Sequence, residues 1–594
     1  MFRLLLALGC ACALAGAQAA PPKVLRLAFP SAETGFDPAK ISDLYSRTVT
    51  PHIFEGLYAY DHLARPFKIK PLTAAALPEI SDTFRHWTVR VQPGIYFADD
   101  PAFKGQRREL VAADYVYAIK RLMDPANKSP VGSTIQDLGI VGLNALRDES
   151  VRTKRPFDYD REVEGLRAVD RQTLQIKVEQ PRPRLLQILA AGDLLGGTAR
   201  EVVEFYGDDI MAHPVGTGPF KLAQWRRSSL IVLERNPDYR ERLYDAEPAA
   251  DDPQGQAIAA SLRGKRIPMV DRVEISIIEE EQPRWLAFLS GDLDLTNVPA
   301  AFVTQALPNN TLAPNLAKKG IQLTRSLNAD GVYTYFNMED PTVGGTEAAQ
   351  VALRRALSLA LDVPRLIRLL YRGQAIPAQS IFIPHCSGYD PNFKSEMGDY
   401  DPARAKALLD LYGFKDVDGD GFRERPDGSR LSIEIATQPS QFNRQFDELW
   451  QKDFAAVGIR VTFFSGKWPE QLKAAYAGKL QMWTLGGSAA SPDGQDSLQS
   501  YFSQQIGSGQ NFARFRNAEV DRIFEETQRS ADGPEREALF ERAKVIGTAY
   551  MPYKALLSRV SNDLTYGHLV GHRRPQFWTE WWHMVDIIQE GAER

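Results

Sequence analysis

The chain contains, at residues 213–225, the stretch His-Pro-Val-Gly-Thr-Gly-Pro-Phe-Lys-Leu-Ala-Gln-Trp, from which its organisation can be worked out. Gly216 and Gly218 allow backbone angles that a side chain would forbid, while Pro214 and Pro219 each fix one backbone angle. We therefore expect a sharp bend, followed by a strand that begins at Ile231 and ends in an Asn-Pro-Asp turn. Gly-Thr-Gly does not indicate a phosphate-binding loop, since no Gly-Lys-Ser/Thr follows it. On chemistry alone the stretch is a structural turn.

The composition limits the classes of function. The chain has 594 residues, of which 44% are apolar, enough to bury the cores of several domains. Its formal net charge is −4 and 25% of its residues are charged, so we expect no bulk basic surface. Nucleic acid and anionic membrane surfaces are therefore not expected as partners.

Residues 1–19 have the composition of a cleavable signal peptide: one cation, a short apolar run and the small-residue site Ala17-Gln-Ala19. The run is too short to anchor the chain in a membrane. The residues before Cys10 also lack the branched side chain expected upstream of a lipid-modified cysteine. Cleavage would remove Cys10 and Cys12 and leave only Cys386. We therefore expect an exported, periplasmic protein without an internal disulfide.

Strands and helices alternate along the second half of the chain. Apolar residues alternate at 431–435 and at 459–463, as in strands, and recur at helical spacing between them at 446–454. This order predicts an α/β lobe with a largely parallel sheet. In the first half, helical spacing predicts an amphipathic helix at 112–123.

Several stretches, in the same order along the chain, resemble one family. Residues 213–225 and the strand after them closely resemble the signature of family 5 of the solute-binding proteins, the peptide/nickel family that serves ABC transporters. The opening Gly-Phe-Asp-Pro-Ala at 35–39 and the Gly-Asp-Leu-Asp at 291–294 are similar to further elements of that family. The resemblance implies a two-lobed α/β periplasmic binding protein of class II, the Venus-flytrap type, with an extra subdomain in the first lobe.

The resemblance also implies domain boundaries and a function. The first lobe would comprise residues 20–326 with its subdomain at about 60–180, the second lobe residues 327–555, and residues 556–594 would return to the first lobe. Members of this family bind a solute between the lobes, close on it by a hinge motion and present it to membrane permease subunits driven by an ATPase. We therefore expect a monomeric receptor that performs no chemistry. The C-terminal tryptophans should belong to the core: Trp578, Trp581 and Trp582.

The same resemblance implies which first-lobe residues approach the ligand. They are a loop after the Asp-Pro turn, the residue after Ser-Pro at 129–130, and a polar residue after the Gly-Asp element: Ser42, Asp43, Leu44, Val131 and Asn297. From the sequence alone, the loop residues are explained equally well as solvated turn residues.

One stretch departs from the family, at residues 483–494: Trp-Thr-Leu-Gly-Gly-Ser-Ala-Ala-Ser-Pro-Asp-Gly. The family usually has Trp-x-Ala-Asp-Tyr-Pro-Asp here, and the first aspartate pairs with the free amine of a bound peptide. In this chain Gly487, Ala490 and Ser491 stand where Trp, Asp and Tyr would. An ammonium group buried without a carboxylate costs several kcal/mol. The usual amine anchor is therefore missing.

Two compensations for the missing anchor are open. Asp493 or Asp496 could replace the carboxylate, although each is also explained as the cap of a turn or helix. The backbone at Gly486 and Ser488 could instead pair with an extended ligand as an added strand, which requires no particular side chain. Peptide-like ligands are the leading hypothesis, and the alternative is a non-peptide solute such as a metal chelate, haem or a sugar conjugate.

A calcium-type loop occupies residues 416–427, Asp-Val-Asp-Gly-Asp-Gly-Phe-Arg-Glu-Arg-Pro-Asp. Asp416, Asp418 and Asp420 occupy positions 1, 3 and 5, and a glycine follows at position 6. Position 12 is Asp427, which is shorter than the usual glutamate. A structural calcium ion is one interpretation and a plain acidic turn is the other. No other cofactor is expected.

Signatures of enzymes are missing from the sequence. No His-Glu-x-x-His, paired Cys-x-x-Cys or Gly-x-Ser-x-Gly motif occurs, which argues against a zinc enzyme and a serine hydrolase. His385 beside Cys386 is too weak a signal to predict a nickel or haem site. A secreted hydrolase is the rival class, because paired carboxylates for glycoside cleavage can lie far apart in a sequence.

Overall fold

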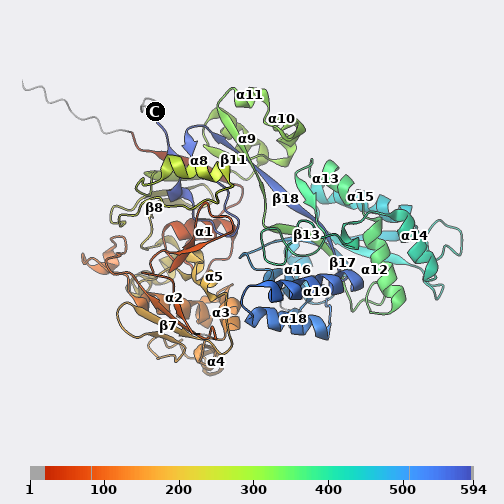
Figure 1. Ribbon diagram of the computed structural model, residues 1–594, viewed down its shortest axis with the longest axis horizontal. Helices are drawn as coiled ribbons and strands as arrows, with labels where there is room; N and C mark the ends of the chain where they lie inside the picture. The colour runs from red at the N-terminus through yellow and green to blue at the C-terminus, as the bar shows by residue number, and fades with distance from the viewer. Residues whose placement is uncertain (1–20, 82, 508, 590–594) are drawn as a thin grey trace, which may run out of the picture.

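The structure is a computed structural model that describes residues 21–589 except residues 82 and 508. The predicted signal peptide, with Cys10 and Cys12, lies outside the described residues. Figure 1 shows two lobes, the first coloured red to yellow-green at the left and the second coloured green-cyan to blue at the right. Both contain strands and helices, as expected for a two-lobed α/β protein. Among the helices within the described residues, none is both long and apolar enough to span a membrane.

The first lobe is built on a four-stranded sheet in the order β1, β10, β9, β8. β1 (Val24–Phe29) is parallel to β10 (Arg272–Ile277), while β9 (Leu230–Arg235) is antiparallel to both β10 and β8 (Phe220–Arg226). Alternate apolar residues of these strands are buried in one core with Trp581 and Trp582. The C-terminal segment therefore packs against the sheet of the first lobe.

The loop that precedes β8 contains Gly216 and Gly218. The prediction that these two glycines supply backbone angles forbidden to other residues is wrong. Neither Gly216 nor Gly218 has a positive φ. Both lie against the backbone of residues 52–54 instead: a Cβ on Gly216 would overlap the carbonyl oxygen of Ile53, and one on Gly218 would lie 2.5 Å from the carbonyl oxygen of His52. The glycines are required by close backbone approach rather than by unusual backbone angles.

The subdomain of the first lobe has its own antiparallel sheet, in the order β4 (Glu79–Ile80), β5 (His86–Arg90), β7 (Thr173–Lys177), β6 (Leu166–Ala168). The amphipathic helix α2 has the predicted bounds, Ala112–Met123, and packs on β6 and β7. Its buried face joins the core that also holds Trp578 and the short helix α5 (Leu185–Leu189).

The second lobe contains a sheet with the path β11, β18, β13, β17, β15, β16. β15 (Ser432–Thr437) is parallel to β16 (Arg460–Ser465) and β17 (Met482–Ser488), but β13 (Asp330–Phe336) is antiparallel to β17 and β18 (Tyr553–Tyr566). The expectation of a largely parallel sheet is therefore wrong, and the sheet is mixed. The reason is that β13 enters this lobe and β18 leaves it, so the two strands run in opposite directions. The covering helices include α12 (Ala348–Ala360), α15 (Gln441–Ala456), α18 (Ala518–Arg529) and α19 (Pro534–Tyr550).

One long strand joins the two lobes. In Figure 1, β18 runs between them. Its first half pairs with β13 and β14 (Ala375–Pro377) in the second lobe, and its second half pairs with β12 (Ile321–Leu327) and β11 (Leu295–Asn297) beside the first. The chain therefore crosses between the lobes on neighbouring extended segments, which is the geometry of a hinge.

Candidate functional site

The C-terminal part of β17 leaves one backbone edge free. β17 pairs with β13 along its whole length but with β15 only at Met482 and Trp483. Just beyond its two ends, Asn337 N donates to Gln481 O and Ala489 N donates to Ala329 O, each at 2.9 Å. Since antiparallel pairing alternates, odd-numbered residues of β17 bond to β13, and the N–H and C=O groups of Gly486 and Ser488 point away from it. This edge can accept an added strand.

The side chains along this edge are small. A Cβ on Gly487 would meet nothing within 4 Å, and one on Gly486 would make only ordinary contacts at 3.5 Å and beyond. Gly486, Ser488 and Ala490 are exposed. Ala489 belongs to a small buried cluster with Ala329 and Cys386, and Phe577 from the C-terminal segment packs against this cluster. The free edge therefore ends where the two lobes meet.

Asp493 is not available as a replacement amine anchor. Its side chain is buried, and it forms ion pairs with Arg536 Nη2 at 2.6 Å and with Arg184 Nε at 2.7 Å. It also accepts a hydrogen bond from the backbone N–H of Gln495, as expected for a capping residue. Two guanidinium groups already compensate its charge, so it does not need a ligand cation.

The ion pair between Arg184 and Asp493 is a contact between the two lobes. Arg184 directly precedes α5 in the first-lobe subdomain, and its side chain extends into the second lobe. There it pairs with Asp532 at 3.2 Å, and its Nη2 donates to three carbonyl oxygens at the end of α18: Thr527, Gln528 and Ser530, at 2.6, 3.0 and 2.9 Å. The lobes are therefore closed on one another at this point. Sequence reasoning did not find Arg184, because nothing in Pro-Arg-Pro-Arg at 181–184 distinguishes it from a surface arginine.

The predicted first-lobe residues have local roles. Asp43 caps α1 (Leu44–Val49) by accepting from Ser46 N at 2.8 Å, while Leu44 is 62% exposed and Ser42 directly precedes the cap residue. Val131 precedes α3 (Gly132–Leu138) and packs against the subdomain core. These contacts agree with the interpretation of the loop as turn residues, and whether the side chains also touch ligand stays a prediction.

Asn297 lies on β11 beside the hinge. Its Nδ2 donates to Asp563 Oδ1 at 3.1 Å, and Asp563 is fully buried on β18. Although burial favours the neutral acid, Arg574 and His572 hold the pKa of Asp563 well below its usual value. Asn297 therefore belongs to the charged network that fixes β11 to β18.

Ser491, Cys386 and His385 take part in contacts with the backbone of neighbouring segments. Cys386 is buried, with its Sγ 3.5 Å from the backbone oxygen of Ser491, and burial raises the pKa of its thiol. A protonated thiol is a poor metal ligand. His385 Nε2 lies 2.8 Å from the backbone oxygen of Leu327 and is used in that contact.

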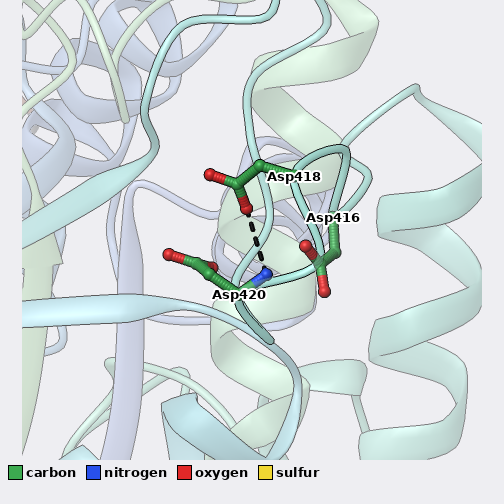
Figure 2. Close-up of side chains that lie close together, drawn as sticks. All are labelled: Asp416, Asp418 and Asp420. Carbon is green, nitrogen blue, oxygen red and sulfur yellow. Dashed lines mark hydrogen bonds between the residues drawn. The ribbon is translucent and has the colours of Figure 1, made fainter.

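The acidic loop brings together three of its four predicted ligands. Figure 2 shows the carboxylates of Asp416, Asp418 and Asp420, which offer oxygen atoms within 4.8 Å of one another. Asp427 lies outside this cluster, and its carboxylate accepts from Ser429 N and Oγ instead. All three clustered aspartates also accept backbone N–H groups of their own loop, and Asp420 forms an ion pair with Arg460.

Comparison with known proteins identifies the family. Residues 68–509 match the bacterial extracellular solute-binding proteins, family 5 Middle. The chain belongs to this family. It is 25% identical over 579 residues to Di/tripeptide-binding protein 2 of Pseudomonas aeruginosa (strain UCBPP-PA14), with 93% of each chain covered. The resemblance inferred from the sequence is confirmed, and the family consists of binding proteins rather than enzymes.

Solved structures confirm the two-lobed fold. This family 5 protein matches DppA from Helicobacter pylori in complex with the peptide STSA with a TM-score of 0.68 and 22% identity, covering 95% of this chain and 97% of that one. It matches NikZ from Campylobacter jejuni in complex with Ni(L-His) with the same TM-score of 0.68 and 17% identity, covering 95% and 100%.

Proposed function

We propose that this protein is a periplasmic receptor of an ABC importer that binds a peptide-like ligand between its lobes and delivers it to the permease subunits and their ATPase. The observation that carries the proposal is the free backbone edge at Gly486 and Ser488. An extended peptide would pair with this edge as an added strand. The receptor acts as a monomer, since opening and closing need no partner copy.

The added strand explains how peptides bind without the usual aspartate. Each backbone hydrogen bond contributes about 0.5–1.5 kcal/mol net, so the pairs offered by Gly486 and Ser488 supply part of the affinity whatever the peptide sequence. A Cβ added to Gly487 would meet nothing within 4 Å, so this side of β17 leaves room for ligand side chains of different sizes. The peptide-binding names of its relatives support the same ligand class.

The second candidate is a receptor for a non-peptide solute. It is favoured by Ala490, which offers no carboxylate where the family usually has one, and by the metal chelate bound to NikZ, which has the same fold. Metal chelates, haem and sugar conjugates would use the space between the lobes without pairing along β17.

Thermal unfolding of the ligand-stripped mature protein tests the proposal. The pools are short peptides, sugar conjugates, haem and metal chelates, and a ligand at a hundred times its Kd adds about 2.7 kcal/mol to the stability. We expect a peptide pool to raise Tm most. A shift produced only by a non-peptide pool would favour the second candidate, and turnover of peptides or glycosides would favour the hydrolase.

We further propose that the acidic loop at 416–427 is a turn held by its own hydrogen bonds and by Arg460 rather than by calcium. Backbone donors engage both carboxylate oxygens of Asp416 and one oxygen each of Asp418 and Asp420, and the Arg460 guanidinium engages the other oxygen of Asp420, so a metal ion would have to displace or share most of these contacts. We therefore expect about 1 mM Ca²⁺ to leave Tm unchanged relative to EDTA. A rise in Tm that disappears in Asp418→Asn would show that the loop binds calcium.

A further inference from the structure

We propose that residues 573–583 form an acid-sensitive strap between the two lobes, which is loosened when His52 and His583 take up protons. The strap is the loop between β19 (Leu569–Val570) and β20 (Asp586–Ile587), which pair with each other and belong to the first lobe. The proposal concerns how the lobes are held together, and it does not depend on which ligand they bind.

The middle of the strap reaches the second lobe. Ala329 lies between β12 and β13, and its backbone N–H donates to Gln576 Oε1 at 3.1 Å. Phe577 packs against the small buried cluster that also contains Cys386 and Ala489, and Ala489 directly follows β17. The strap therefore contacts the second lobe next to the end of β17.

One end of the strap is held by ion pairs that mild acid leaves intact. Arg573 pairs with Asp252, and Arg574 pairs with Asp563. Although burial favours the neutral acid at both positions, the partners of Asp252 and Asp563, which include these arginines, hold the pKa of each aspartate below its usual value. Both pairs therefore keep their charges between pH 7 and pH 5.

The other end of the strap is docked on His52, which ends the short helix η1 (Thr50–His52) of the first lobe. The ring of His52 stacks on that of Trp582 with centres 3.9 Å apart, and its Nε2 accepts a hydrogen bond from Trp582 N at 3.1 Å. Its Nδ1 lies 3.0 Å from the backbone oxygen of Thr48. Since a backbone N–H only donates and a carbonyl oxygen only accepts, the proton of the ring is on Nδ1. The docked strap therefore requires neutral His52.

A proton on Nε2 of His52 would break this contact. The new N–H group would face the N–H of Trp582, and the ring is 0% exposed, so its charge would be buried. The other aromatic side chains against the ring are Phe220 and His583, of which His583 can titrate, and no carboxylate among the described residues pairs with His52. Burial lowers the pKa of His52 to about 3. His52 therefore takes up a proton only when the strap opens.

His583 adds to the effect from the strap itself. It follows Trp582, is 4% exposed, and its Nδ1 has no hydrogen-bond partner within the part of the chain that the structure describes. Burial, with the positive charges of Arg242 and Arg240, holds the pKa of His583 well below its usual value. His583 is therefore also neutral in the docked strap.

The carboxylates beside His583 do not compensate a proton there. Glu55 and Glu580 line the same hollow as His583. Glu55 already pairs with Arg240 at 2.6 Å. Burial raises the pKa of Glu580 to about 8, so its neutral form predominates below pH 7. Acid therefore adds positive charge to this hollow without a counterion.

The size of the effect follows from proton linkage. The pKa of a free histidine is about 6.5, and a histidine that is neutral in the docked strap binds its proton only in the open one. The docked form is therefore favoured above pH 6.5 and loses this advantage as pH falls. Between pH 7 and pH 5 each such histidine raises the ratio of open to docked strap by about 25-fold.

Amide hydrogen exchange of the ligand-free protein, corrected for the intrinsic effect of pH on exchange, tests the proposal. Between pH 7 and pH 5, we expect the protection of Trp582 N, which bonds to His52, to fall by about 25-fold or more. The protection of Ala329 N, which bonds to Gln576, should fall with it. Amides of β13 that bond to β17 should keep their protection.

A matched pair of variants assigns the proton. His52→Gln keeps a polar side-chain terminus near the position of Nε2 but cannot titrate, so it should remove one factor of about 25 from the fall at Trp582. His86→Gln changes an exposed histidine of the same lobe and should show the full fall of wild type.

The other outcomes overturn the proposal. Constant protection of Trp582 in wild type would show that the strap does not respond to acid, and this measurement needs no variant. A fall at Trp582 with no change at Ala329 would show that the strap does not act between the lobes. Equal falls in wild type and His52→Gln would remove His52 as the trigger, and a parallel fall throughout β13 would show that acid unfolds the whole protein.

Discussion

Substitution of Asp493 by Asn should lower the free energy of unfolding by about 3–5 kcal/mol, which is the cost of removing one partner from a buried ion pair. The variant leaves the guanidinium groups of Arg184 and Arg536 without the buried one of the two carboxylates that they share. Arg536 is 2% exposed, so water cannot replace the lost partner there. Because Arg184 belongs to the first lobe, the loss should also favour the open form. Urea unfolding measures the first effect, and small-angle scattering of the ligand-stripped protein measures the second.

Asp532→Asn is the matched control for this prediction. Asp532 pairs with the same two arginines, at 3.2 and 3.1 Å, but its side chain is 74% exposed. Exposed pairs contribute about 0–1 kcal/mol, so this variant should unfold almost as wild type does. Equal losses in the two variants would contradict the view that burial of Asp493 makes its ion pairs important.

Substitution of Gly216 by Ala should lower the free energy of unfolding by about 3 kcal/mol, at the upper end of the usual cost of overpacking. The added methyl group overlaps the carbonyl oxygen of Ile53, and that oxygen accepts a hydrogen bond from Gly218 N at 2.8 Å. Neither backbone segment can move without breaking this bond. The midpoint of urea unfolding should fall with an unchanged m-value.

Gly487→Ala is the control for the glycine prediction. A Cβ at this position meets nothing within 4 Å, so stability should change by no more than about 0.5 kcal/mol. If Gly216→Ala were equally mild, the loop would be free to move and close approach would not be the reason for its glycines.

The sequence predicts those elements of the fold that depend on a local pattern of residues. The helix Ala112–Met123 follows from its apolar spacing, and the buried C-terminal tryptophans follow from the resemblance. The direction of β13 could not be predicted, because strand direction depends on which lobe each neighbouring segment comes from. The sequence predicts that a glycine is required at position 216, but it does not show why. The reason is a close contact with Ile53, which is far away in the sequence and cannot be recognised from the neighbouring residues.

The candidate site was only partly predictable for a similar reason. The missing aspartate at Ala490 and the backbone at Gly486 and Ser488 are visible in one short stretch. The pairing of Asp493 with Arg184 joins residues that lie far apart in the sequence and in different lobes. Such partners become visible only once the lobes are placed together.

Amide hydrogen exchange at β17 tests the central claim most directly. The ligand-stripped protein would be measured with and without the short peptide that raises its Tm most. We predict that exchange at Gly486 and Ser488 slows by about tenfold or more, because the ligand strand bonds to these amides. Leu485 and Gly487, already bonded to β13, should change little. Tight peptide binding with no added protection at Gly486 and Ser488 would contradict the account.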